Sequence, residues 1–478
     1  MVRFKHVVSL PNLSKVSLLL VALYGHAFAS SFALGHEYST TEVGLAGAGG
    51  AAYAQDATTN YSNPAGLVNL KNPEFVAGGT IIDSSAQFSG QACGGASTLG
   101  AGACNLTPAS ANGGTTSFVP EFSYGMPITD RLFAGISVTA PFGLATNYGD
   151  DTALRYQATK STIETININP NIAFKFTDQF SVGAGINAQY MNADLDSYSN
   201  LSPNPTATPI LTPLGVFPGT IQYPTDSQLK NSAADWGWGW DVGGLYQFSP
   251  GSRIGLMYRS AVQHTLDGSS KYSGGGGQAT IDGFGVVAAQ PYPTFKTDTS
   301  IDIKLPAVTT ASFYQDLTPQ WALLGTVNYT QWNSIQNITL NDIAFLNTSS
   351  TSLIAPPLAR PSVNPQNFDN TWTYALGTEY KLTEAWTLRA GGAYDQSPIN
   401  NTDRTVRLPD SNRWTGAVGA GYRINQYVKV DAAYSHIWFD DAPINQPGAG
   451  VSQYTSSSIG NVDVSANIYS LQATVDLV

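Results

Sequence analysis

Residues 180–190 read FSVGAGINAQY and alternate between two kinds of side chain. One face of the stretch is apolar, with the aromatic residues Phe180 and Tyr190 at its ends, whereas the other carries only Ser, Gly, Asn and Gln. A period of two is the signature of a β-strand, because neighbouring side chains point to opposite faces. An apolar, aromatic-ended face opposite a small or polar face indicates a barrel strand that crosses a membrane around a polar lumen.

The same alternation recurs beside short polar turns, which join pairs of strands at one end. These turns are residues 127–133, 176–180, 248–253, 316–321, 381–386 and 423–427. The connections at the other end are long and rich in Gly, Pro, Ser, Asn and Thr, and they cover residues 90–115, 146–160, 197–233, 268–294, 334–368, 396–411 and 440–462. Short turns on one side and long loops on the other are typical of periplasmic turns and extracellular loops.

The six short turns join twelve strands, and one further strand at each end makes fourteen. We therefore predict an all-β fold, a 14-stranded antiparallel transmembrane β-barrel over residues 73–478. It would begin near Glu74 and finish with the strand from Ile468 to Leu477. A soluble β-sandwich or propeller also alternates, but it predicts more charge on the outer face and no asymmetry of loop length.

The composition agrees with a membrane barrel. Charged residues make up 12% of the chain, about half the share in soluble globular proteins. The formal net charge of −11 argues against a nucleic-acid partner, because nucleic acid recruits basic patches.

The N-terminus has the features of a secretory signal peptide over residues 1–29. Basic residues precede the apolar run VSLLLVALY at 16–24, which leads to Ala27-Phe28-Ala29, a cleavage site of the A-x-A type. The run is too short to span a bilayer as a helix, and no other segment approaches 18 consecutive apolar residues. We expect an exported protein of the outer membrane of a Gram-negative bacterium.

Little in the chain suggests metal, cofactor or covalent chemistry. The two cysteines, Cys93 and Cys104, lie in a Gly/Ala/Ser segment, where a loop disulfide is favoured over two free thiols in an exported protein. C-x-x-C and Cys/His metal spacings are absent, so no cofactor or metal is expected. A barrel lipid hydrolase would need a serine close to one of the five histidines, and the sequence contains no G-x-S-x-G.

Residues 30–72 precede the first barrel strand. Their central stretch, GLAGAGGAAYAQDATTNYSNPAGL at 44–67, has neither the alternation of a strand nor the apolar volume of a core. We expect an N-terminal hatch, or plug, inside the lumen. A flexible linker is the alternative.

Several features concern the lumen and its wall. The alternation places Arg259, Arg389, Arg413 and Asp395 on the inner face. Asp395 and Arg413 flank the loop 396–411, so they form either an ion pair that satisfies two charges or part of an anchor for an anionic headgroup. The stretch from Pro141 to Gly143 interrupts the third strand, either as a gap in the wall or because the strand ends there.

Long motifs carry a family resemblance. They are EYSTTEVGLAGAG (37–49), NPAGL (63–67), PFGLATNYGD (141–150), RYQATKSTIETININPNIAFKF (155–176), WGWGWDVGGLYQF (236–248) and LPDSNRW (408–414). With them the chain resembles the outer-membrane long-chain fatty-acid transporter (FadL-like) family, which also includes transporters of aromatic hydrocarbons. The resemblance covers the chain from the end of the signal segment to the last strand.

The resemblance implies a route for a hydrophobic small molecule. Extracellular loops would capture it in a groove, and it would leave sideways into outer-membrane lipid, through a gap at the strand-three kink formed by Pro141, Phe142 and Gly143. The other implied residues are the hatch segment Asn63, Pro64, Ala65 and Gly66 beside the kink and a groove in the long loops, for which Leu211, Leu214, Phe217, Phe284 and Val286 are suitable apolar residues. The inward residues Arg413, Arg259 and Asp395 are the candidate anchor for an anionic headgroup. A passive, monomeric transporter is expected; a hydrocarbon channel, a porin for hydrophilic solutes and a lipid hydrolase are the alternatives.

Overall fold

The computed structural model describes residues 37–96, 104–199, 206–212, 215–281, 284–291, 294–346, 357–446 and 457–477. The predicted signal peptide and the groove residue Leu214 lie outside these ranges. No helix within them is long and apolar enough to cross a membrane.

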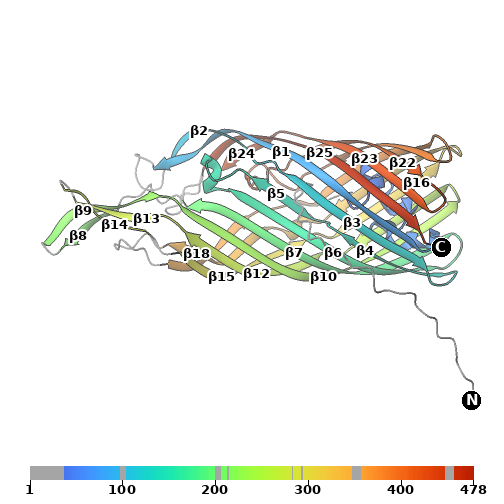
Figure 1. The fold of residues 1–478 in the computed structure, drawn as a ribbon, viewed down its shortest axis with the longest axis horizontal. Coiled ribbons are helices and arrows are strands. Elements are labelled where there is room, and N and C mark those ends of the chain that lie inside the picture. The colour runs from blue at the N-terminus through green and yellow to red at the C-terminus, as the bar shows by residue number, and fades with distance from the viewer. Residues whose placement is uncertain are drawn as a thin grey trace, which may run out of the picture.

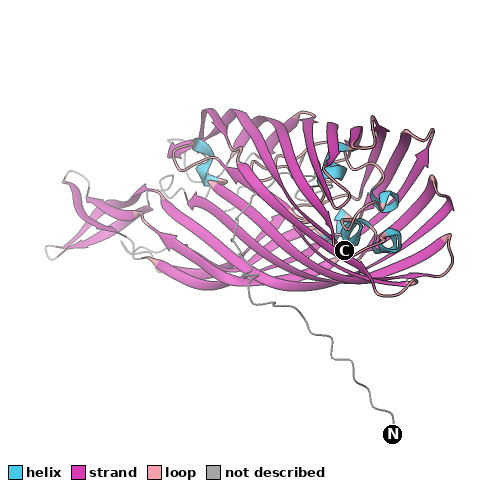
Figure 2. Ribbon diagram, turned by 45° about the vertical axis from the view of Figure 1, so that its right-hand side comes forward, coloured by secondary structure: helices cyan, strands magenta, loops and turns pink. Residues whose placement is uncertain are grey.

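The chain forms a closed, antiparallel barrel of fourteen strands, as the turn pattern predicts (Figures 1 and 2). Seven strands are continuous: β1 (Glu74–Ala96), β6 (Lys160–Lys175), β7 (Phe180–Ser199), β10 (Ser227–Ser249), β21 (Trp386–Asp395), β22 (Arg413–Arg423) and β25 (Ser458–Asp476). The barrel closes where β1 pairs with β25, from Glu74↔Asp476 to Ala92↔Ser458.

The other seven strands are each interrupted once, so that each consists of two segments. They are β2 (Cys104–Asn112) with β3 (Thr116–Pro127), β4 (Leu132–Thr139) with β5 (Gly143–Asn147), β11 (Ser252–Arg259) with β12 (Val262–Ser273), β15 (Phe295–Leu305) with β16 (Val308–Asp316), β17 (Trp321–Thr330) with β18 (Asn337–Leu346), β19 (Pro357–Pro365) with β20 (Thr371–Lys381), and β23 (Val428–Phe439) with β24 (Ala442–Gln446).

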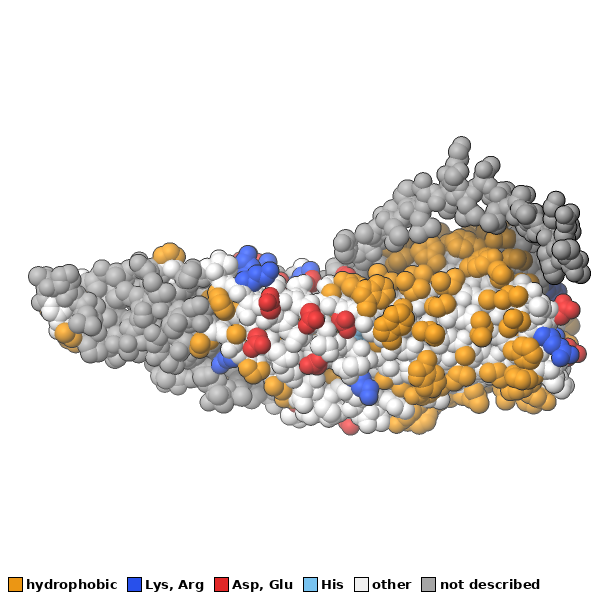
Figure 3. Space-filling view, turned by 90° about the horizontal axis from the view of Figure 1, so that it is seen from below, with side chains coloured by type: hydrophobic (Ala, Val, Ile, Leu, Met, Phe, Trp, Pro, Cys, Tyr) orange, Lys and Arg blue, Asp and Glu red, His pale blue; other side chains and the backbone are white. Residues whose placement is uncertain are grey.

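The two faces of the wall differ as the alternation predicts. On β7, Phe180 and Ile186 are exposed on the outer face, whereas Asn187 and Gln189 are buried on the inner face. Apolar side chains form a broad band around one part of the barrel, and charged side chains gather on the part nearer the long loops (Figure 3). This band is the surface that faces lipid.

Four short helices form the hatch inside the barrel (Figure 2). They are α1 (Thr40–Gly44), α2 (Gly50–Tyr53), α3 (Thr59–Ser62) and the 3-10 helix η2 (Pro64–Asn69). Two further 3-10 turns, η3 (Ala153–Tyr156) and η4 (Trp332–Ser334), lie within the connections of the wall. The hatch residues Val43, Leu45, Ala65 and Leu67 are fully buried, so the segment is packed against the wall and is no free linker.

Two of the predicted long loops, 197–233 and 268–294, contain strands in their described parts. They form a four-stranded sheet in the order β14 (Gly285–Pro291), β13 (Gly276–Ile281), β9 (Gly215–Thr225) and β8 (Thr206–Thr212). This sheet extends beyond the barrel at the long-loop end (Figure 1). Since β9 belongs to one loop and β13 to the other, their pairing joins the loops 197–233 and 268–294.

A buried ion network links the wall to the hatch. The Arg389 guanidinium lies 3.0 Å from Glu379 Oε2 and 2.8 Å from Asp431 Oδ1. The Tyr53 hydroxyl of the hatch donates to Glu379 and accepts from the Arg389 guanidinium. Three buried charges and a phenol therefore satisfy one another.

We expect Arg389→Met to lower the unfolding temperature of the barrel by several degrees or more. Two carboxylates would be left in the lumen without their shared cation, and breaking a buried pair in this way costs about 3–5 kcal/mol. The temperature at which the barrel loses its compact mobility on a gel measures the effect. Lys429→Met is the matched control, because Lys429 also pairs with Asp431, at 3.0 Å, but is partly exposed; an equal loss in both variants would contradict the prediction.

Candidate functional site

The hatch is attached to the wall through its backbone carbonyls. Its helices are only four to six residues long, and short helices leave many carbonyls without partners. Wall side chains supply the donors: Arg253 Nε to Ala52 O at 2.5 Å, Arg253 Nη2 to Tyr53 O, Arg259 Nη2 to Tyr61 O at 2.6 Å, Asn171 Nδ2 to Asn60 O at 3.0 Å, and Ser181 Oγ to Ala65 O at 2.9 Å. These donors come from three strands, β6, β7 and β11, so they fix the hatch to this side of the lumen.

Glycines in the wall allow the hatch backbone to approach. A Cβ at Gly255 would lie 1.8 Å from Ala51 O, and one at Gly391 would lie 2.1 Å from Leu45 O. Such distances are impossible for any side chain, because they fall below 3.0 Å and meet backbone rather than a movable group. The hatch can therefore occupy the lumen only because these inward-facing wall residues are small.

The Asn-Pro-Ala segment makes its hydrogen bonds to the wall at strands five and six. Asn63 is fully buried, and its Nδ2 donates to Ala51 O at 2.7 Å and to Gly244 O of β10 at 3.1 Å. Its Oδ1 accepts from the Ala65 N–H and caps η2, which begins at Pro64. Asn63 is therefore hydrogen-bonded to the sixth strand, and Ala65 O accepts a hydrogen bond from β7, the fifth strand.

Asn60 of the hatch lies against strands two and three, and η2 also packs on strand three, where Leu67 and Phe133 belong to one buried cluster. The Asn60 Nδ2 donates to Tyr124 O of β3 at 2.8 Å, and the Asn60 side chain lies where a Cβ of Gly135 on β4 would be. This residue was not singled out from the sequence, since nothing in TTNYSNP distinguishes one asparagine from the other as a contact of strand three.

The predicted strand-three kink is an interruption between β4 and β5. Pairing with β6 changes from Thr139↔Asn167 to Gly143↔Glu164, so three residues of strand three face two of β6. Thr165 fills this bulge: its Oγ1 accepts from the Phe142 N–H at 2.9 Å and donates to Phe142 O at 2.7 Å. Thr165 was not recognised from the sequence, where it looks like any inward polar residue of the alternation.

The bulge coincides with a gap in the ladder between strands two and three. β3 pairs with β4 as far as Phe122↔Val138. In the described part of the chain β5 pairs with β6 alone, and contact with strand two resumes where the Asn147 N–H donates to Gly113 O at 2.9 Å. Between Val138 and Asn147, the described backbone groups of strand three that face strand two are therefore unpaired.

Pro120 lies on the edge of this gap. The Ser84 N–H donates to Thr115 O, so odd-numbered residues of β3 turn their backbone groups to β1 and even-numbered ones turn them to strand three. Pro120 is even-numbered and has no N–H, which removes one donor that would otherwise face the gap unpaired.

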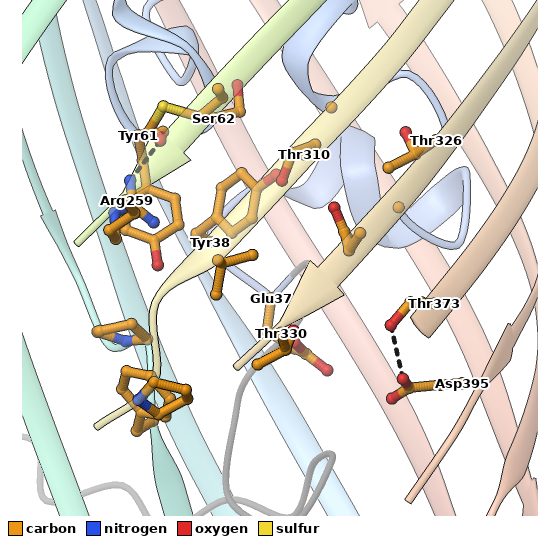
Figure 4. Close-up of a pocket in the computed structure, with 18 of the residues that line it drawn as sticks. Glu37, Tyr38, Tyr61, Ser62, Arg259, Thr310, Thr326, Thr330, Thr373 and Asp395 are labelled. Atoms are coloured by element: carbon orange, nitrogen blue, oxygen red, sulfur yellow. Dashed lines mark hydrogen bonds between the residues drawn. The ribbon is translucent and has the colours of Figure 1, made fainter. Parts of the chain in front are cut away.

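An inner cavity of about 160 Å³ lies between the hatch and the kink. Its lining includes Tyr38, Tyr61 and Ser62 of the hatch, Pro141 and Phe142 of the kink, and Arg259, Asp395 and Arg413 of the wall. Figure 4 shows Tyr38, Tyr61 and Arg259 on one side of this space and Thr373 with Asp395 on another. The hatch thus meets the kink across a cavity, through Tyr61 and Ser62.

The two arginines of the inner cavity have different partners. Arg413 contacts two carboxylates, Asp395 Oδ2 at 2.5 Å and Asp410 Oδ1 at 3.0 Å, so its charge is balanced. Arg259 donates to the neutral Tyr61 carbonyl and lies 3.5 Å from the centroid of the Tyr61 ring. Of the predicted anchor residues, Arg259 alone is held by neutral groups, while Asp395 and Arg413 form the predicted ion pair.

Of the predicted capture residues that the structure describes, Leu211, Phe217 and Val286 lie on strands of the four-stranded sheet, and Phe284 directly precedes β14. The rings of Phe217 and Phe284 meet edge to face, with centroids 6.3 Å apart. Phe284 and Val286 are 76% and 58% exposed, so they present apolar surface to solvent. Leu211 belongs to β8.

In the barrel, Cys93 of β1 is disulfide-bonded, and Cys104, the chain's other cysteine, begins the neighbouring strand segment β2.

Comparison with known proteins finds one family. Residues 20–477 match the family described as "Outer membrane protein transport protein (OMPP1/FadL/TodX)". The long-chain fatty acid transport protein of Escherichia coli O6:H1 is 30% identical over 456 residues, covering 94% of this chain and 95% of the relative. Outer membrane protein P1 of Haemophilus influenzae is 27% identical over 449 residues, covering 89% and 90%.

Solved structures share the fold. A Pseudomonas aeruginosa FadL homologue superposes with a TM-score of 0.74 at 21% identity, covering 95% of this chain and 99% of the other. The toluene transporter TodX of P. putida gives a TM-score of 0.64 at 17% identity, covering 93% and 99%.

We expect Asn63→Ala to loosen the hatch without unfolding the barrel. The change removes all three hydrogen bonds of the side chain and leaves Gly244 O and Ala51 O without this donor, at about 1–3 kcal/mol for each buried group. Hydrogen exchange over residues 44–67 should accelerate at least tenfold. Asn69→Ala is the control, because Asn69 is exposed and makes one bond, to Ala54 O at 3.2 Å; unchanged exchange in Asn63→Ala would count against the role of Asn63.

Proposed function

The chain belongs to the outer membrane protein transport protein family (OMPP1/FadL/TodX), and from this premise we propose that it carries long-chain fatty acids across the outer membrane. The coarser statement, an outer-membrane transporter of fatty acids or other hydrophobic compounds, follows from its homologues. Transport would be passive and would use a single copy of the chain.

One observation carries the choice of fatty acids. The inner cavity combines apolar and aromatic side chains with the Arg259 guanidinium, whose hydrogen bond ends on a neutral carbonyl. A carboxylate would be a stronger acceptor for this cation than a carbonyl, because it carries a full negative charge and can accept two parallel N–H bonds from the guanidinium. A neutral hydrocarbon would gain nothing from it.

The magnitude of the hydrophobic effect supports release into lipid. A chain of about fifteen methylenes gains roughly 12 kcal/mol on leaving water, at about 0.8 kcal/mol for each. Release through an aqueous channel would have to restore most of that cost, whereas release sideways would not. The gap between β3 and β5 next to Phe142 is the place in the wall that suits such a step.

The proposed route has three stages. The apolar surface around Phe284 on the four-stranded sheet captures the acid at the long-loop end, which is taken as extracellular. The acid then passes into the barrel and reaches the inner cavity beside Arg259. Displacement of the hatch near Tyr61 and Ser62 finally gives access to the gap in the wall.

The alternatives have less support. Hydrocarbon uptake is suggested by the structural likeness to the toluene transporter TodX, although the Arg259 cation would then have no ligand. A hydrophilic porin would need an open lumen, which the buried hatch occupies. For a lipid hydrolase, the ring nitrogens of the two described histidines, His264 and His436, hydrogen-bond Gln189 and Asn467 rather than a serine.

We expect Arg259→Gln to weaken palmitate binding by about tenfold or more and to leave toluene binding within about twofold. A hydrogen bond to a charged group contributes about 1.5–3 kcal/mol, and only the acid can use it. Calorimetry on purified protein with each ligand measures both affinities. Lys296→Gln, which removes an exposed charge on β15, is the control. Equal loss for palmitate and toluene, or no loss, would refute a carboxylate anchor at Arg259.

A bridge across the wall gap should stop delivery. We expect Thr116→Cys with Asn147→Cys, two exposed positions on β3 and β5, to lose at least tenfold in transfer of labelled palmitate into vesicle lipid once a cleavable bis-maleimide joins them. Palmitate binding should remain, because the route inward is open. Cleavage of the linker should restore transfer, and the single-cysteine variants treated alike are the controls. Undiminished transfer in the bridged protein would exclude this exit.

A further inference from the structure

Residues 396–412, which connect β21 to β22, form a strap inside the barrel rather than the extracellular loop expected from their composition. Val406 is fully buried and Leu408 is 7% exposed. β21 and β22 are the eleventh and twelfth strands, and the strap contacts β6 and β7, the fourth and fifth. In a barrel of fourteen strands these pairs face each other, so the strap crosses the lumen.

The strap keeps its shape through its own contacts. Arg404 is buried and donates to Asp410 O at 2.7 Å and to Asn401 Oδ1 at 2.5 Å. The Ser397 hydroxyl donates to Asp410 Oδ2 at 2.5 Å, and Asp410 Oδ1 also pairs with Arg413. These bonds connect the strap to itself and to β22, and none of them reaches the far wall.

Arg407 makes the contacts across the lumen. Its Nη1 lies 2.9 Å from Ser161 Oγ and 3.4 Å from Lys160 O of β6, and its Nη2 lies 3.1 Å from Asp196 O of β7. The Thr146 hydroxyl of β5 donates to Arg407 O at 3.3 Å. One side chain and one carbonyl thus tie the strap to the opposite side of the barrel.

The acceptors of the Arg407 guanidinium are all neutral. Burial lowers the pKa of Arg407 to about 10, and the nearby Asp196 carboxylate partly opposes this shift. Asp196 accepts from Arg407 through its backbone carbonyl, and the adjacent Asp194 carboxylate lies 3.7 Å from Lys160 Nζ. A partly buried cation whose hydrogen bonds all end on dipoles is less well compensated than Arg389 and Arg413, which pair with carboxylates.

Arg407 also borders an outer pocket of about 540 Å³. Its strap side includes Thr405, Arg407 and Leu408. Its wall side is mainly apolar and includes Ile163, Leu195, Leu229, Leu266, Ile301 and Ile303. A cation at the edge of an apolar pocket suits an amphipathic acid, whose tail would lie on the wall while its carboxylate reaches the guanidinium.

We propose that Arg407 docks the carboxylate of an entering amphipathic acid, and that its occupation by this ligand releases the strap from β6 and β7. The strap is then an entry gate that acids open and neutral hydrocarbons do not. The ligand replaces neutral acceptors with a charged one, so the bonds that hold the strap across the lumen are exchanged for bonds to cargo. This inference rests on the proposed function, since it concerns the route to the same inner cavity.

Distance measurements between spin labels test the gate. Thr402→Cys on the strap and Lys271→Cys on the outer face of β12 are exposed sites for the labels, and Cys93 is disulfide-bonded and does not react. In the full-length protein, saturating palmitate should shift the distance distribution, whereas hexadecane should not. Arg407→Gln should give the shifted distribution without ligand and weaken palmitate binding by about tenfold.

Two further variants keep the outcome decisive. Ser161→Ala keeps the arginine but removes one of its acceptors. This variant should shift the distance distribution in part and leave palmitate binding equal or tighter. Lys296→Gln should behave as the unmodified protein. If palmitate binds without a shift, or if Arg407→Gln and Ser161→Ala both retain the original distances, the gate is wrong and the transport proposal stands. If the unmodified protein does not bind palmitate, both are wrong.

Discussion

Lipid offers no hydrogen-bond partner to a polypeptide backbone, and the structure depends on meeting this constraint. The wall meets it by closing, with β1 and β25 paired along almost their full length. The constraint also gives meaning to each interruption. Where β4 stops, Thr165 takes both backbone groups of Phe142, and Pro120 removes a donor from the facing edge. The gap is therefore an edge at which some backbone polar groups are absent and others are hydrogen-bonded.

The same requirement governs the plug. A small segment of short helices can sit in the lumen only if the wall supplies donors for its carbonyls and leaves space for its backbone. Arg253 and Asn171 do the first, and Gly255 does the second. The arginines of the lumen consequently fall into two groups. Arg389 and Arg413 are bound to carboxylates. Arg253, Arg404, Arg259 and Arg407 are bound to neutral oxygens, and of these Arg259 and Arg407 line the two pockets, where the proposed anionic ligand would reach them.

The fold could be predicted from the sequence because a membrane wall imposes a two-sided pattern on every strand. Alternation as in residues 180–190 identifies both the strand and its lipid face, and short turns give the strand number. The plug could be recognised as a segment without that pattern. The partner of Asn63 on β10, the role of Thr165 and the course of the strap could not be predicted, because each depends on which strands face one another across the lumen. Alternation says that a residue points inward, but not toward what.

The two pocket-lining arginines with neutral partners lie one after the other along the proposed route. Arg407 borders the outer pocket, and Arg259 lines the inner cavity next to the kink. An acid that moves from one to the other keeps its carboxylate near a cation at both positions and its chain against apolar side chains. Arg407 hydrogen-bonds across the lumen from the strap to β7, and Arg259 hydrogen-bonds the hatch at Tyr61. Under the proposed route, binding of the headgroup releases first the strap and then the hatch. A concentration gradient is then sufficient to drive transport. Selectivity for acids arises from the same contacts that keep the barrel closed.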